Sequence, residues 1–555
     1  MRRVCASPVP GRPRRSGRMN ALWTLILSGL LLVGLLVALL FRGAPIDDGG
    51  TATLKLYCAA GMRVPVEEVI RRYEAEYGIK VIPQYGGSNT LLSQIQVNKF
   101  DTADLFLAAD DAYTAQAVEL GLAAETLPIA DVRPVIAVAR SSKRIQTFSD
   151  LLDDDVSVAM ADPDQAAVGK ATRRLLMAVP TGTTDPDAGN ARVTAWDQLE
   201  RHVTDRGVFK PTVNDVANDV RLGAVDAGIV WDSTVAMPKY REHLRAVSIP
   251  ELEGDPDQLS IAVLTSSRQP TAALRFARYL SAADRGLPVF EEYGMRPIEG
   301  DRWAERPNLT FFCGAVNRRA IEPIVADFKL REGVDVNMNY NGCGVLTSVM
   351  QTIEGQRPDR GFPDVYMACD RYYLENVADW FQEATELSDT EIVIAVPKGS
   401  ARVRSLADLL EPGVRVAVGQ PEQCTIGALT RRILAAEGLY EGLMAKQRQD
   451  GEVVVEKSSS ALLIPDVVTG HVDAAIAYIS DTLAHRGEID VIRIDSALNL
   501  AIQPFSIART SPHKHLARRL LRRLAAAPQA FEAAGFHFRL DTAAGLGPGA
   551  SIREP

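Results

Sequence analysis

The feature that most constrains this chain is residues 54–96, because this stretch occurs twice. Shifted forward by 255 residues, it aligns with 309–351 without a gap, and 12 of its 43 positions are identical. A repeat with so long a period is a whole domain rather than the short unit of a solenoid. We therefore expect a duplicated domain, and we name the copies repeat one (52–300) and repeat two (307–540).

The repeated stretch has the pattern of a strand, a helix, a second strand and a turn into another helix. Apolar residues alternate from Leu54 to Cys58, as in a strand, and then recur from Val66 to Tyr73 with helical spacing. Gly78 follows at the position of a helix C-cap. The turn Gly-Gly-Ser-Asn-Thr at 86–90 then leads into a helix start, where free backbone N–H groups and the helix dipole attract anions.

The duplication continues beyond this stretch. Residues 103–110 match 363–370, and 136–176 match 394–434, in the same order in both copies. Between these matches, apolar runs of strand length alternate with amphipathic helical segments. This alternation predicts an α/β fold with mainly parallel strands.

The N-terminal region predicts a membrane anchor. Residues 1–20 carry six Arg and no acidic residue, and 21–41 carry no charge, which at ~1.5 Å per residue spans a bilayer core. The arginines place 1–20 in the cytoplasm and the bulk of the chain in the periplasm or outside the cell. A cleaved signal sequence is the alternative, but no small-residue cleavage site follows, so we favour a single-pass anchor. A linker at 42–51 precedes the repeats, and a Gly/Ala/Pro-rich tail at 541–555 is expected to be disordered.

Charge and motifs favour binding over catalysis. The formal net charge is −9, although the first 48 residues carry seven Arg against two Asp. An acidic body argues against nucleic acid as a partner, because that affinity rests on neutralising phosphates. The sequence has no nucleophile elbow, HExxH motif, P-loop or Rossmann glycine fingerprint. We therefore expect no enzyme activity and no cofactor.

Each repeat resembles a periplasmic solute-binding protein of the molybdate-binding type. The motifs that carry the resemblance, in order, are the small-residue loop after the first strand, Gly-Gly-Ser-Asn-Thr-Leu, Ala-Asp-Leu-Phe-Leu-Ala-Ala-Asp, Asp-Ala-Gly-Ile-Val-Trp and Phe-Glu-x-x-Gly. The resemblance covers nearly all of both repeats. It implies two tandem type II periplasmic-binding-protein domains, each with two α/β lobes around a cleft. In repeat one it implies a first lobe of 52–133 plus 237–300, and a second lobe of 134–236.

The resemblance also implies a function. A small anionic solute, a tetrahedral oxyanion similar to molybdate, tungstate or sulfate, would be held between the lobes and delivered to an ABC transporter permease. Ser88 stands where a family serine donates a hydroxyl, whereas Gly61 replaces another family serine. This loss of donors argues against molybdate itself. The candidate ligand-binding residues are Ala60, Gly61, Arg63, Gly87, Ser88, Asn89, Val168 and Trp231 in repeat one, and Ala315, Val316, Arg318, Gly342, Cys343, Ile426 and Tyr478 in repeat two.

Several of these residues have a second interpretation. Ser88 and Asn89 either donate to an anion or simply cap a helix. Arg63 and Arg318 either bind an anion bidentately or form ion pairs with Glu67 and Glu322, four residues further on, and we favour the ion pairs. Trp231, which replaces a family tyrosine, either stacks on a ligand or fills the hinge region.

The cysteines of repeat two leave three alternatives open. Cys313, Cys343, Cys369 and Cys424 each lie in a loop that the fold would direct towards the cleft, whereas Cys58 is alone in repeat one. They are buried small hydrophobic residues, disulfide partners, or ligands for a soft metal such as zinc or copper(I). No CxxC pair is present, so we favour burial or a disulfide. The alternative function is a ligand sensor in the membrane without a transport role, or a soft-metal or thiol-based site in repeat two.

Overall fold

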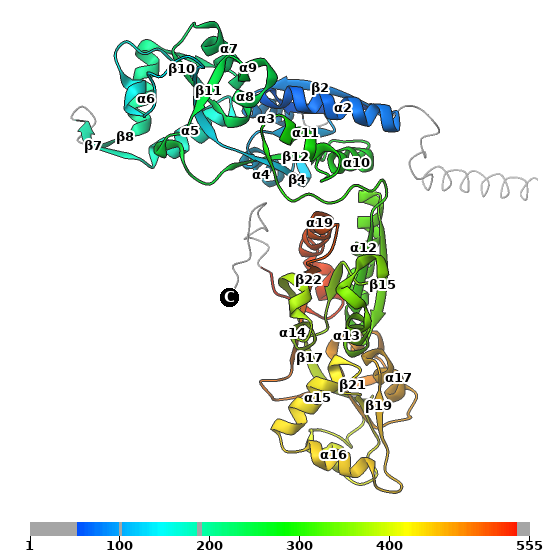
Figure 1. Cartoon of the computed structure of the whole chain (residues 1–555). Coiled ribbons are helices and arrows are strands. Elements are labelled where there is room, and N and C mark those ends of the chain that lie inside the picture. Colours follow the sequence, from blue (N-terminus) through cyan, green and yellow to red (C-terminus); the bar gives the residue numbers. More distant parts are fainter. Residues whose placement is uncertain (1–52, 99–102, 186–190, 541–555) are drawn as a thin grey trace, which may run out of the picture. The chain divides into compact units, whose positions relative to one another are not determined.

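The computed structural model describes residues 53–98, 103–185 and 191–540 (Figure 1). The predicted cytoplasmic N-terminus, the membrane segment 21–41, the linker and the tail at 541–555 lie outside these residues. Within the described part of the chain, no helix combines the length and the apolar character needed to cross a membrane.

Lobe one of repeat one is built on a six-stranded sheet with the order β13-β4-β12-β3-β1-β2. β1 pairs in parallel with β2 and β3, whereas β12 runs antiparallel to β3 and β4. The strands are β1 (Thr53–Ala59), β2 (Lys80–Gly86), β3 (Leu105–Ala108), β4 (Ala123–Val132), β12 (Asp257–Leu264) and β13 (Arg296–Pro297). The helices are α2 (Arg63–Tyr77), α3 (Ser88–Val97), α4 (Asp111–Glu119), α10 (Pro270–Leu280) and α11 (Gly286–Glu292).

Lobe two of repeat one has a five-stranded sheet with the order β11-β5-β10-β6-β9. The strands are β5 (Pro134–Ala139), β6 (Val158–Ala161), β9 (Val208–Lys210), β10 (Ala227–Trp231) and β11 (Leu244–Val247), with a separate hairpin of β7 (Pro180–Asp185) and β8 (Ala191–Thr194). The helices are α5 (Ala167–Met177), α6 (Ala195–Arg206), α7 (Val213–Leu222), α8 (Asp232–Ala236) and α9 (Pro238–Arg241). The expected end of this lobe at residue 236 is wrong, because β11 pairs with β5. The chain therefore returns to lobe one between β11 and β12.

Repeat two joins its two lobes through one long strand, β17 (Phe381–Pro397). The first part of β17 pairs with β22, and the part from Ile392 to Ala395 pairs with β20. The sheet order is β15-β14-β16-β22-β17-β20-β18-β19, and β21 and β23 also pair with β17. The strands are β14 (Asn308–Gly314), β15 (Asp335–Asn341), β16 (Val365–Met367), β18 (Val416–Gly419), β19 (Val454–Lys457), β20 (Ala474–Tyr478), β21 (Ile489–Arg493), β22 (Leu500–Ala508) and β23 (His537–Phe538).

The first two helices of repeat two occur in the same order as the first two helices of repeat one. Lobe one contains α12 (Arg318–Glu332), α13 (Cys343–Thr352), α14 (Arg371–Glu375), α19 (Lys514–Ala525) and α20 (Pro528–Ala533). Lobe two contains α15 (Thr425–Ala436), α16 (Tyr440–Gln447), α17 (Leu463–Val468) and α18 (Ile479–Thr482).

The duplication extends to the strand register. Leu54 lies opposite Val81 in the pair of β1 and β2, and Leu309 lies opposite Val336 in the pair of β14 and β15. Leu309 and Val336 are the equivalents of Leu54 and Val81 after the same shift of 255 positions. A slip of one residue would turn every side chain to the other face of the sheet, so the shared register fixes the same core in both repeats.

Helix α2 has the predicted apolar face and the predicted end. Val66, Val69 and Tyr73 are fully buried beneath it. Gly78 ends the helix with a φ of 69°, and Gly333 ends α12 with a φ of 65°. This left-handed conformation carries a steric penalty for residues with a Cβ atom, which accounts for glycine at both helix ends.

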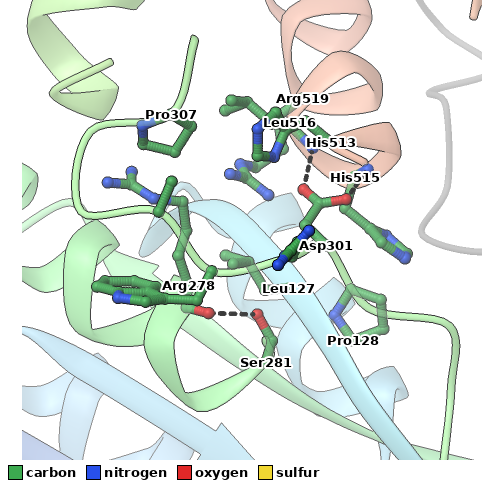
Figure 2. Close-up of a pocket in the computed structure, with 13 residues that line it drawn as sticks. Leu127, Pro128, Arg278, Ser281, Asp301, Pro307, His513, His515, Leu516 and Arg519 are labelled. Atoms are coloured by element: carbon green, nitrogen blue, oxygen red, sulfur yellow. Dashed lines mark hydrogen bonds between the residues drawn. The ribbon is translucent and has the colours of Figure 1, made fainter. Parts of the chain in front are cut away.

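A buried charge network joins α10 of repeat one to α12 and α19 of repeat two. Arg278 Nη1 lies 3.1 Å from Glu332 Oε2, and Arg519 Nε lies 2.6 Å from Glu332 Oε1. Burial acts to raise the pKa of Glu332, but the two guanidiniums outweigh it and hold this pKa below its usual value. Figure 2 shows both arginines beside a small pocket, where Asp301 accepts a backbone N–H from His515 at 2.8 Å. Since both arginines are paired with Glu332, we assign this pocket to the junction between the repeats.

Candidate ligand-binding site

Helix α3 begins at Ser88, three residues earlier than the sequence pattern indicates. Gly87 is its N-cap, with an extended φ of −67° and no described side chain capping the helix. A Cβ atom on Gly87 would lie 2.4 Å from the main-chain oxygen of Gln165 in lobe two. The missing side chain therefore lets lobe two approach the start of α3 closely.

Ser88 is positioned to donate a hydrogen bond into the space between the lobes. Its side chain is buried, and its Oγ accepts the backbone N–H of Ala109 at 3.2 Å. A serine hydroxyl that accepts one hydrogen bond still has its own hydrogen to donate. The loop after β3 therefore fixes the Ser88 oxygen and leaves its O–H available.

A cavity of about 20 Å³ lies between the two lobes of repeat one. It exceeds the ~10–15 Å³ that a single water molecule needs. None of the described residues that line it is charged. The predicted site residues that line it are Ala60, Gly61, Gly87, Ser88, Val168 and Trp231. The side chain of Trp231 is buried at the end of β10 and forms part of the wall.

Three helix starts meet at this cavity. The short 3-10 helix η1 (Ala60–Met62), α3 and α5 all begin there, and no described side chain caps any of them. The first N–H groups of a helix have no partner within the helix, and they carry the positive end of its dipole. η1 and α3 belong to lobe one and α5 to lobe two, so both lobes direct N–H groups at the same small volume.

The start of α7 is a fourth contributor, which was not predicted from the sequence. Thr212 and Val213 line the cavity, and the Thr212 hydroxyl donates to Asp215 at 2.6 Å. The spacing Thr-x-x-Asp at 212–215 is typical of a helix N-terminus, so the start of α7 could have been predicted from it. Because its hydroxyl is occupied by Asp215, Thr212 contributes shape rather than a donor.

The lobes of repeat one are closed on each other. Asn89 Nδ2 donates to the main-chain oxygen of Asp164, and the Asn89 N–H donates to Gln165 O at 3.3 Å. Asn214 Nδ2 of lobe two donates to Ala60 O of lobe one at 2.7 Å. The Asn89 side chain therefore bridges the lobes, and its contact with a ligand stays a prediction.

The two arginines that were predicted as ligand-binding residues each form an exposed ion pair. Arg63 Nε lies 2.9 Å from Glu67 Oε1, and Arg318 Nη2 lies 3.0 Å from Glu322 Oε1. About 60% of each arginine side chain is exposed, and neither residue lines a cavity between lobes. The ion pair that we favoured is present in both repeats.

Repeat two has a smaller cavity at the equivalent place. Its volume is about 10 Å³, and the predicted residues that line it are Ala315, Gly342, Ile426 and Tyr478. Val316 and Cys343 are buried beside it but do not line it. Tyr478 Oη and Thr425 Oγ1 are buried here without a hydrogen-bond partner among the described residues. The sequence analysis missed Thr425 and Ser459, which occupy the positions of Ala167 and Thr212.

The cysteines of repeat two divide into two kinds. Cys313 is a buried residue at the end of β14, as is Cys58 in β1. Cys343, Cys369 and Cys424 lie at or beside the cavity, and all are free thiols. No group of three or more potential metal ligands is present in the described parts of the chain. The metal interpretation is therefore not supported by this arrangement.

Comparison with known proteins identifies a family match in each repeat. The sequence model of a family described as "Bacterial extracellular solute-binding protein" matches residues 54–296 and 309–537. "Molybdate-binding protein ModA" of Mycobacterium tuberculosis is 26% identical over 283 residues, covering 50% of this chain and 98% of the relative. "Putative ABC transporter substrate-binding lipoprotein YvgL" of Bacillus subtilis is 23% identical over 255 residues, covering 45% and 88%. These relatives are each about as long as one repeat.

Solved structures give matches of similar extent. The periplasmic molybdate-binding protein of Azotobacter vinelandii is 16% identical, with a TM-score of 0.35, and covers 44% of this chain and 98% of that chain. The sulfate-binding protein SubI from Mycobacterium tuberculosis is 17% identical, with a TM-score of 0.38, and covers 52% and 94%.

Proposed function

Because the chain belongs to the bacterial extracellular solute-binding proteins, as a tandem duplication of that family's domain, we propose that repeat one captures a small tetrahedral oxyanion. The observation that carries this proposal is the uncharged cavity at the starts of η1, α3 and α5. Backbone N–H groups at helix starts stabilise an anion without a neighbouring cation. The name of the molybdate-binding relative supports the same class of ligand.

Binding in this proposal depends on both lobes. The oxyanion first contacts the Ser88 hydroxyl and the start of α3 in lobe one. Closure then brings the start of α5 onto its other side and forms the bonds from Asn89 to Asp164 and from Asn214 to Ala60. Each hydrogen bond to a charged group is worth ~1.5–3 kcal/mol, so a few donors from each lobe favour the closed form.

The closed repeat one would be presented to an ABC-type permease. The name of the Bacillus subtilis relative supports this role. The charge-free run at 21–41 supports a membrane anchor that holds the repeats next to the permease. Fractionation of cells that express the full chain, compared with a chain lacking 1–41, tests the anchor. Recovery of the full chain in the soluble fraction would contradict it.

Titration of the full chain with molybdate, tungstate, sulfate and phosphate by isothermal calorimetry tests the binding proposal. Replacing Ser88 with alanine removes one donor to the anion and is expected to weaken binding roughly 10- to 150-fold. Ser93→Ala on the same helix is the matched control, because Ser93 is exposed, and it should leave the affinity unchanged. The absence of heat with all four anions, or an equal affinity of the Ser88 variant and wild type, would refute the proposal.

A further inference from the structure

Three positions of the repeat-one cavity are occupied by cysteine in repeat two. Ser88, Ala109 and Ala166 all line the cavity of repeat one, and their equivalents are Cys343, Cys369 and Cys424. Cys343 and Cys369 belong to lobe one, at the start of α13 and after β16, whereas Cys424 precedes α15 in lobe two. The site that presents a hydroxyl in repeat one therefore presents thiols in repeat two.

The two thiols of lobe one are in direct contact. Cys343 Sγ lies 3.0 Å from Cys369 Sγ, whereas a disulfide bond needs ~2.05 Å, so an approach of about 1 Å separates the thiols from a bond. The backbone N–H of Cys369 donates to Cys343 Sγ at 3.1 Å, as the N–H of Ala109 donates to Ser88 Oγ in repeat one. The sulfur thus occupies the place of the serine oxygen.

A glycine in the neighbouring strand makes room for both sulfurs. A Cβ atom on Gly314 would lie 2.2 Å from Cys369 Sγ and 2.9 Å from Cys343 Sγ. The equivalent residue in repeat one is Ala59, which faces the smaller Ser88 and Ala109. An alanine at 314 would prevent the observed contact between the thiols, so the pair depends on this glycine.

The surroundings favour different protonation states for the two thiols. Burial acts to raise the pKa of Cys343, but the hydrogen bonds that it shares with the Cys369 thiol and accepts from the Cys369 N–H outweigh it and lower this pKa. Cys343 is also the first residue of the ten-residue helix α13, where the dipole stabilises a thiolate. The pKa of Cys369 is raised well above its usual value by the hydrogen bond to Cys343 and by burial. Cys343 is therefore the nucleophile of the pair.

We propose that Cys343 and Cys369 form a redox-active dithiol in the cleft of repeat two, which reacts with external disulfides when the lobes open. The Cys343 thiolate attacks one sulfur of the external disulfide and displaces its other half as a thiolate. Cys369 then loses its proton to water and attacks the Cys343 sulfur, which releases the second half. The net reaction converts two protein thiols and one disulfide into one protein disulfide and two small thiols.

Equilibration of the reduced full chain with defined ratios of reduced and oxidised glutathione tests this proposal. After quenching with N-ethylmaleimide, peptide mass spectrometry should show a link between Cys343 and Cys369. Cys58 and Cys313 are the internal controls, because each is buried in a strand and its described hydrogen bond goes to a main-chain oxygen, and they should remain free. Before quenching, Cys343 should react with iodoacetamide roughly tenfold or more faster than these controls.

Two variants separate the roles of the thiols. Cys369→Ser should stop the reaction at a mixed disulfide between glutathione and Cys343. Cys343→Ser restores the residue type found at position 88 in repeat one, and it should leave Cys369 unmodified. The proposal would be overturned by wild-type protein that forms no Cys343–Cys369 link at any ratio, or by a link that no ratio reduces. It does not rest on the oxyanion site, so its failure would leave the function proposed for repeat one intact.

Discussion

Replacing Gly87 with alanine is expected to weaken ligand binding by repeat one while leaving both lobes folded. Gly87 has a φ of −67° and a ψ of 144°, which alanine adopts without strain. The added methyl would lie 2.4 Å from Gln165 O and 3.2 Å from Pro211 O, both in lobe two. Ordinary contacts begin at 3.4 Å, so lobe two must retreat by about 1 Å to accept the methyl group.

This overlap raises the free energy of the closed form only, because the contacting atoms belong to the other lobe. Forcing an extra methyl group into a packed contact costs ~1–3 kcal/mol, which corresponds to a roughly 5- to 150-fold increase in Kd. Calorimetric titration with the oxyanion that wild type binds most tightly gives the affinity. Circular dichroism and the thermal midpoint confirm that the variant is folded.

Two other glycines provide controls for this experiment. Gly342→Ala produces the equivalent overlap in repeat two, 2.5 Å from Gln423 O, and should leave oxyanion affinity unchanged. Gly487→Ala adds a methyl with no atom within 4 Å and should change nothing. An unchanged Kd for Gly87→Ala, or a loss of affinity with Gly342→Ala instead, would refute the reasoning.

Three further predictions concern other parts of the structure. Glu332→Gln leaves Arg278 and Arg519 buried without a neutralising charge and should destabilise the protein by ~3–5 kcal/mol, measured as a lower urea midpoint. Burial raises the pKa of Asp257 from 3.8 to about 7, so its contribution to stability is complete below pH ~4 and is lost as the pH rises to about 7. Asp257→Asn should therefore flatten the dependence of the thermal midpoint on pH and raise it at pH 8. Arg63→Ala should leave oxyanion affinity within about twofold of wild type, because its guanidinium is exposed.

Each of these predictions has a result that would contradict it. Glu322→Gln, at an exposed ion pair, should cost less than ~1 kcal/mol, and an equal effect of the Glu322 and Glu332 variants would argue against the buried network. An Asp257→Asn variant that keeps the wild-type dependence on pH would assign that dependence to another group. A large loss of affinity in Arg63→Ala would place the guanidinium at the ligand after all.

The sequence predicted the features that depend on local periodicity and on the duplication. The face of α2 from Val66 to Tyr73 and the glycine at its end follow from spacing, whereas the cavity residues Gly87, Ser88 and Trp231 follow from the family resemblance. Both repeats share the helix face, the glycine at its end and the glycine at position 87 or 342, and each of these signals is contained in a few neighbouring residues.

The features that were missed depend on contacts between distant segments. Asn89 bridges to Asp164 across the cleft, and no local pattern shows which residue of lobe two it meets. The pairing of β11 with β5 places 244–247 in lobe two, although the local sequence does not indicate which strand this segment pairs with. The contact between Cys343 and Cys369 requires β14 and β16 to be adjacent, and only the strand order of the folded sheet shows that they are.

The most direct test of the central claim is a crystal structure of the full chain grown with the oxyanion that it binds most tightly by calorimetry, with anomalous data collected for the central atom of that anion. The proposed function predicts an anomalous peak between the lobes of repeat one, within hydrogen-bonding distance of Ser88 Oγ and the first N–H groups of α5. A peak located only in repeat two, only at the arginines of the junction, or nowhere in a crystal that retains the closed lobes would contradict it.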